Sequence, residues 1–183
     1  VDLNDDGLDD LLIGNWGGEV AHYVNTGCEF GVEKEVLVEL PRGSNATPRA
    51  VDIDADGDFD LVLGSSGGNF YLFENIGSKS DPRFELVEDT FEGIKSRHRS
   101  APAFSDLDND GDLDMFTGSK IEGILYFENI GSAENASFKA SELPFKVATS
   151  PMSNPFAADL NEDGIDEILI GSRSGGLLYY HRN

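Results

Sequence analysis

The sequence contains four copies of one acidic segment, and this repetition limits the possible folds more than any other feature. The copies read VDLNDDGLDDLLIG, VDIDADGDFDLVLG, SDLDNDGDLDMFTG and ADLNEDGIDEILIG, with leading acids at Asp2, Asp52, Asp106 and Asp159. These acids lie 50, 54 and 53 residues apart, and a glycine follows each of them by 12 positions, at Gly14, Gly64, Gly118 and Gly171. Self-similarity at such a period is typical of repeat architectures built from one supersecondary unit.

Short apolar runs, separated by turn residues, make up each repeat. In the second repeat the runs cover residues 48–52, 60–64, 69–75 and 84–87, and in the third repeat the fourth run lies near Phe138. Their β-branched and aromatic residues predict strands. The turns are too short to hold a crossover helix, so the strands are expected to pair antiparallel.

The strands do not alternate cleanly between apolar and polar residues, which indicates that both faces of each small sheet are covered. Sheets of one kind stacked face to face satisfy this pattern, and a repeat of about 50 residues fits a four-stranded blade. We therefore predict an all-β fold, a β-propeller of antiparallel four-stranded blades to which the chain contributes four repeats. A β-sandwich is the alternative.

The repeats form a single domain over residues 1–183, divided approximately at 1–47, 48–101, 102–154 and 155–183. The first and last repeats are incomplete, since the sequence opens at the edge of an acidic segment and closes at the end of an expected strand. We expect a piece of a longer array.

The acidic segments follow the pattern D-x-[DN]-x-D-G-x-x-[DE], which suits Ca²⁺. In a tightly curled loop the side chains at positions 1, 3 and 5 converge, the glycine at position 6 allows the turn, position 7 offers its carbonyl and position 9 a carboxylate. We name the segments 2–10, 52–60, 106–114 and 159–167 loops one to four. The predicted ligands are Asp2, Asn4, Asp6, the Leu8 carbonyl and Asp10; Asp52, Asp54, Asp56, the Asp58 carbonyl and Asp60; Asp106, Asp108, Asp110, the Asp112 carbonyl and Asp114; and Asp159, Asn161, Asp163, the Ile165 carbonyl and Glu167.

Other interpretations of these loops fit less well. Solvated acidic turns would not require four copies in register, each with its glycine. Mg²⁺ demands rigid octahedral geometry and retains its water. Zinc is disfavoured because no cysteine or histidine lies within the loops. An EF-hand needs a glutamate at position 12, where this chain has Ile13, Leu63, Thr117 and Ile170.

Charge and composition exclude several classes of partner. The chain carries 35 Asp and Glu against 13 Lys and Arg, a formal charge of −22, which would repel nucleic acid and anionic membranes. It has no apolar run long enough to insert into a bilayer. Its single cysteine, Cys28, cannot form an internal disulfide.

No nucleophile elbow, phosphate loop or zinc motif is present, so we expect a protein that is not an enzyme. A propeller lyase acting on polysaccharides is the alternative. Of the three histidines, His22 and His181 are interpreted as packing residues on aromatic strands, and His98 as part of a solvated basic loop.

The four acidic loops, the D-L-x-x-G-type strands and the FENIGS segments at 73–78 and 127–132 resemble the FG-GAP/VCBS repeat family, whose blades also form the head of integrin α subunits. The resemblance implies a ring of about seven blades, with a Ca²⁺ loop between the first two strands of each. It also implies an extracellular or cell-surface setting, and recognition or adhesion through a protein or glycan ligand. A self-associating subunit of an extracellular filament or sheath is the alternative. Two glycosylation sequons, at Asn45 and Asn135, would suit a glycoprotein.

Overall fold

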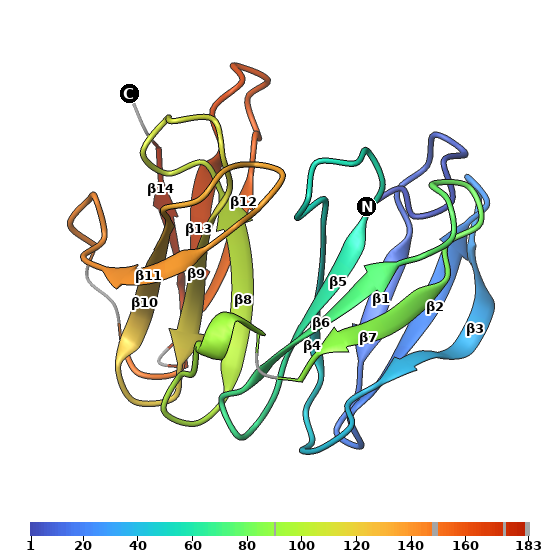
Figure 1. The fold of residues 1–183 in the computed structure, drawn as a ribbon, viewed down its shortest axis with the longest axis horizontal. Coiled ribbons are helices and arrows are strands. Elements are labelled where there is room, and N and C mark those ends of the chain that lie inside the picture. The colour runs from blue at the N-terminus through green and yellow to red at the C-terminus, as the bar shows by residue number, and fades with distance from the viewer. Residues whose placement is uncertain (90, 148–149, 174, 182–183) are drawn as a thin grey trace.

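Nearly all of the ordered structure in this chain is β-sheet. The computed structural model describes residues 1–89, 91–147, 150–173 and 175–181, which fold into four small antiparallel sheets and one 3₁₀ turn, η1 (Phe91–Gly93) (Figure 1). None of the described helices is long and apolar enough to cross a membrane.

The sheets follow one another along the chain, and in each of them neighbouring strands are consecutive in sequence. Sheet one contains β1 (Leu11–Gly14), β2 (Glu19–Asn25) and β3 (Phe30–Glu39). Sheet two contains β4 (Thr47–Val51), β5 (Asp60–Gly64), β6 (Phe70–Asn75) and β7 (Phe84–Glu88). Sheet three contains β8 (Ser100–Ser105), β9 (Asp114–Ser119), β10 (Gly123–Asn129) and β11 (Phe138–Ser141). Sheet four contains β12 (Asn154–Ala158), β13 (Glu167–Gly171) and β14 (Leu177–Tyr180).

These bounds confirm the strands predicted for the second repeat to within about a residue, and β11 is the strand expected near Phe138. Loops two, three and four each join the first two strands of their sheet, and loop one leads into β1. The β-hairpin that follows each loop has the same register in all four sheets, with the repeat glycine opposite the residue six positions later.

Three hydrophobic clusters hold the four sheets together, one between each successive pair. Sheets one and two share a cluster around Val20, Leu61 and Tyr71. Sheets two and three share one around Phe70, Phe104 and Met115, to which η1 adds Phe91. Sheets three and four share a third, which includes Ala103, Phe116, Tyr126, Ile168 and Ile170. The expectation that both faces of a sheet are covered is therefore confirmed for sheets two and three.

The repeat glycines mark the closest approach between neighbouring sheets. A Cβ atom at Gly64 would overlap the backbone carbonyl of Ser100, and one at Gly118 would overlap that of Ser153. Gly14 meets the carbonyl of Ala46 in the same way. Gly171, in sheet four, has only the Asn154 carbonyl oxygen within 4 Å of this position, at 3.9 Å.

Arg49 connects the first strands of three sheets, β4, β8 and β12, which lie beside one another. Its Nε donates to the carbonyl of Pro102 at 3.1 Å, and Nη2 donates to the carbonyl of Pro155 at 3.4 Å. The guanidinium also lies 5.1 Å from the centre of the Phe156 ring, within the range of a cation–π interaction. A single cation thus bridges sheets that are separated by two repeats in sequence.

The four sheets do not close into a ring within the described residues. Apolar side chains remain exposed at both ends of the stack, among them Leu11 and Ile13 on β1 and Leu177 and Tyr179 on β14.

Candidate metal loops

The four loops share one backbone conformation. Position 6 is a glycine with φ between 85° and 97° in every loop, at Gly7, Gly57, Gly111 and Gly164. Position 4 also has positive φ, between 57° and 63°, although it holds Asp5, Ala55, Asn109 and Glu162. Positive φ is uncommon for residues other than glycine. Its recurrence at one position in four loops indicates that the motif fixes this conformation.

Carboxylates inside each loop accept hydrogen bonds from the loop's own backbone. The N–H of Gly164 donates to Asp159 at 2.8 Å, and the N–H of Ile165 donates to Asp163 at 2.9 Å. The Gly164 bond is the leading reason why the pKa of Asp159 lies below its ordinary value. The other loops contain the same two bonds, at 2.8 to 3.2 Å. The acids at positions 1 and 5 are thereby held by the backbone of their own loop.

Loops two and three bring their acids at positions 1, 3 and 5 together as predicted. One carboxylate oxygen from each of Asp52, Asp54 and Asp56 lies within 4.8 Å of the other two, and the same holds for Asp106, Asp108 and Asp110. Loops one and four have asparagine at position 3, so positions 1, 3 and 5 supply only two carboxylates in each of these loops.

Position 7 contributes a second functional group in loops two and three that the sequence analysis missed. Only its carbonyl was predicted to matter, yet Asp58 and Asp112 carry carboxylates there. Asp112 is 9% exposed, and burial followed by repulsion from Asp110 raises its pKa to about 6. One oxygen of each, and one of Asp52, is buried without a hydrogen-bond partner. Buried oxygens without partners are costly unless a cation meets them, so these residues fit Ca²⁺.

The acids at position 9 lie beneath the loops and are buried in all four repeats: Asp10, Asp60, Asp114 and Glu167. Asp114 accepts the N–H of Leu107 at 3.0 Å and that of Asn129 at 2.8 Å, which ties the loop to the end of β10. Asp60 accepts the N–H of Asn75, at 2.8 Å, and burial raises its pKa to about 7. In loops two and three these carboxylates stand outside the groups formed by positions 1, 3 and 5.

A side chain of β2 reaches the position-9 acid in the first repeat, and a side chain of β10 does so in the third. His22 lies 2.9 Å from Asp10, and the Tyr126 hydroxyl donates to Asp114 at 2.9 Å. Both partners stand 12 residues after their acid, where the second repeat has Leu72. The interpretation of His22 as a packing residue is therefore incomplete. It is buried, but its ring nitrogen also meets a buried carboxylate.

Comparison with known protein families gives matches that span these same loops. A model described as the FG-GAP-like repeat matches residues 2–63, 52–117 and 106–170. The chain belongs to the FG-GAP-like repeat family. Each match runs from one acidic loop through the next loop and into the strand after it, so the FG-GAP-like unit includes the loops described here. No curated protein matches the chain.

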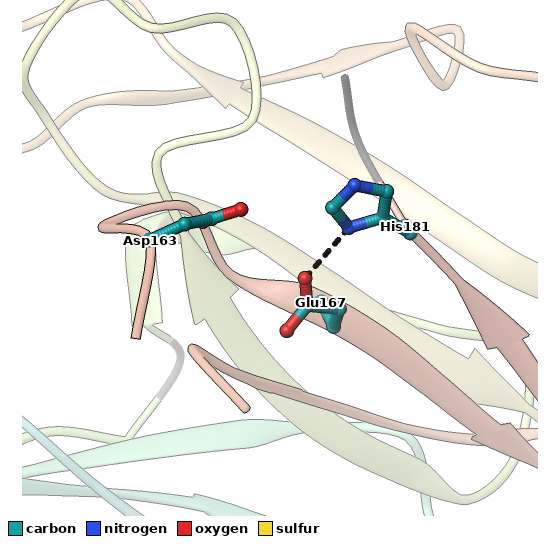
Figure 2. A group of neighbouring side chains, drawn as sticks. All are labelled: Asp163, Glu167 and His181. Atoms are coloured by element: carbon teal, nitrogen blue, oxygen red, sulfur yellow. Dashed lines mark hydrogen bonds and ion pairs between the residues drawn. The ribbon is translucent and has the colours of Figure 1, made fainter. Parts of the chain in front are cut away.

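Loop four differs from the other FG-GAP-like loops of this chain because, among the described residues, it alone groups a histidine with two of its acids. Nδ1 of His181 lies 2.8 Å from Oε1 of Glu167, and one ligand atom from each of Asp163, Glu167 and His181 lies within 4.8 Å of the other two (Figure 2). Zinc was disfavoured because no histidine lies within the loops. The structure corrects that argument, since pairing of β14 with β13 places His181 beside Glu167.

Proposed function

We propose that this chain is a calcium-binding repeat module for recognition or adhesion outside the cell. One structural Ca²⁺ would lie in each loop, and the sheets would be blades of a β-propeller. The convergence of three carboxylates in each of loops two and three carries the proposal. Ca²⁺ takes six to eight oxygen ligands. Both groups offer only oxygen, and the unpartnered oxygens of Asp52, Asp58 and Asp112 lie in the same two loops.

The role proposed for Ca²⁺ is structural. The loop backbone already holds the acids at positions 1 and 5, so binding requires little rearrangement. Carboxylates this close repel one another without a cation. An ion that binds the folded form and not the unfolded one stabilises the fold by mass action.

The packing of the sheets supports the propeller arrangement. The first strands of sheets two, three and four lie beside one another, and successive sheets stack through shared clusters. The exposed apolar side chains on β1 and β14 suit a further sheet of the same kind. Further repeats would supply it in a ring, and a second copy would supply it in a filament or sheath. Light scattering of the chain with and without Ca²⁺ distinguishes these arrangements, because only the filament or sheath requires copies of the chain to assemble with one another.

We propose a binding role rather than catalysis, with a protein or glycan as the partner. Trp16, in the turn between β1 and β2, is 76% exposed, and exposed aromatic side chains often anchor such contacts. It is also the only tryptophan. Its fluorescence would therefore report a ligand that covers this turn.

Thermal unfolding in Ca²⁺ and in EDTA tests the calcium proposal. At a Ca²⁺ concentration 100-fold above the Kd, one site adds about 2.7 kcal/mol, or roughly 5–10 °C for a chain of this size. Asp56→Asn should reduce this gain, and Glu35→Gln, at an exposed position on β3, should not. Equal melting temperatures in Ca²⁺ and EDTA would refute the proposal.

A further inference from the structure

We infer that loop four is a zinc site, with Asp163, Glu167 and His181 as its protein ligands. This inference does not depend on Ca²⁺ binding at the other loops. Asp163 and Glu167 are also the acids predicted to bind Ca²⁺ in loop four, so the two ions compete there.

The donor atoms distinguish this site from loops two and three. Its three ligand atoms, two carboxylate oxygens and one imidazole nitrogen, lie within 4.8 Å of one another. Imidazole suits zinc and similar transition metals, whereas Ca²⁺ takes oxygen ligands. Three protein ligands and a water complete the tetrahedral shell that zinc favours.

The hairpin formed by β13 and β14 holds the nitrogen and one oxygen in place. Tyr180 pairs with Ile168, so the next residue, His181, comes level with Glu167 at the start of β13. Glu167 is fully buried, and its Oε2 accepts the N–H of Leu160 at 2.9 Å. Its Oε1 faces His181 at 2.8 Å and also accepts a hydrogen from the Asn161 amide at 2.7 Å. Zinc on Nδ1 would leave the ring proton on Nε2.

Asp163 supplies the third ligand from the loop itself. In Figure 2 its carboxylate points toward the space beside Glu167 and His181. The His181 side chain is 38% exposed, so an ion can enter from solvent.

Loop one provides an internal comparison. His22 meets Asp10 at 2.9 Å, but these two side chains are 4% and 0% exposed. With Asp6 they do not form a three-atom group of the kind found in loop four, as far as the described residues show. A histidine beside the position-9 acid is therefore not sufficient to form a group of three metal ligands. Loop four adds the third ligand and access from solvent.

Titration calorimetry with ZnCl₂, on protein held in enough Ca²⁺ to saturate loops two and three, tests the inference. We expect one zinc per chain, and an affinity at least tenfold weaker in His181→Asn. That variant keeps an amide donor for Glu167 but removes the imidazole. His98→Asn changes an exposed histidine far from loop four in sequence and should bind zinc as the unchanged chain does.

Imidazole NMR provides a second measurement, in which zinc should shift the ring nitrogens of His181 and leave those of His22 and His98 in place. Absence of zinc binding, or equal zinc affinity in His181→Asn, would overturn the inference. The Ca²⁺-dependent melting temperature of His181→Asn is measured alongside. A retained Ca²⁺ effect shows that the calcium proposal stands even if the zinc site fails.

Discussion

Tyr126 donates its hydroxyl hydrogen to a carboxylate oxygen of Asp114 across 2.9 Å, and both side chains are buried beneath loop three. The same carboxylate accepts two backbone N–H groups, those of Leu107 and Asn129. The hydroxyl is thus the one side-chain donor among the three hydrogen bonds that hold this acid.

Tyr126→Phe should lower the free energy of unfolding by about 1–3 kcal/mol, because it removes a donor from a buried carboxylate. Tyr71→Phe is the matched control, since its hydroxyl donates to the neutral carbonyl of Arg42 at 3.0 Å. A bond to a neutral acceptor is worth about half as much. Urea unfolding without metal measures both variants. A loss from Tyr71→Phe as large as that from Tyr126→Phe would contradict this account.

Asp60 should make the metal-free protein more stable at pH 5 than at pH 7. Burial raises its pKa from 3.8 to about 7 in the folded protein, so the folded form binds a proton where the unfolded form has lost it. This contribution is complete below the unfolded pKa and is lost as the pH rises through about 7. Chemical unfolding across pH 5 to 8 should show a weaker dependence in Asp60→Asn. If the free energy of unfolding depended on pH equally in Asp60→Asn and in the unchanged chain, Asp60 would not be responsible for that dependence.

Gly118→Ala should destabilise the fold by about 1–3 kcal/mol, the usual cost of overpacking, because the new Cβ overlaps the Ser153 carbonyl. Gly171→Ala occupies the equivalent position of sheet four, where the nearest atom is 3.9 Å away. It should change stability by no more than about 0.5 kcal/mol. Thermal melts of the two variants, compared with the unchanged chain, decide whether the glycine is needed for the approach between sheets.

Loops two and three should bind Ca²⁺ more tightly than loops one and four, because asparagine replaces one acid in the latter pair. Asn4→Asp should therefore strengthen Ca²⁺ binding at loop one, by roughly tenfold if the added charge is worth about 1.4 kcal/mol. Without Ca²⁺ the same change should destabilise the fold, since the Asn4 amide donates to Asp6 at 3.1 Å and a carboxylate would repel it. Calorimetry with Ca²⁺ tests the expected gain in affinity, and thermal melts in EDTA test the expected loss of stability.

Much of the fold could be predicted because the acidic loop and the hairpin after it occur four times in the sequence. The repeated glycines and apolar runs located the strands of sheet two, and the acid spacing located the loops. Convergence of Asp52, Asp54 and Asp56 could also be predicted, since alternate residues of a curled loop turn toward one point.

Contacts that differ between repeats could not be predicted in the same way. The residue 12 positions after the position-9 acid is His22, Leu72, Tyr126 or Tyr179. The hairpin register is the same in all four sheets, so it does not explain why Tyr126 meets Asp114 while Tyr179 is 57% exposed. His181 reaches Glu167 from a different position, 14 residues on. A polar residue 12 or 14 positions after the acid was the available signal.

Contacts between distant repeats could not be predicted from the sequence either. Arg49 binds carbonyls 53 and 106 residues away, and nothing near it in sequence indicates those partners. They follow from the stacking order of the first strands, which local patterns do not encode.

Each hydrophobic cluster belongs to two sheets, and among the described residues no sheet encloses a core of its own. A single repeat therefore cannot bury its apolar side chains alone, and its stability depends on contacts with its neighbours. Such an array can be lengthened by duplicating a whole repeat, because the copy brings both of the surfaces needed to join the stack. Loss of part of a repeat is different, since it leaves the adjacent sheet with an unmatched face and weakens two units at once.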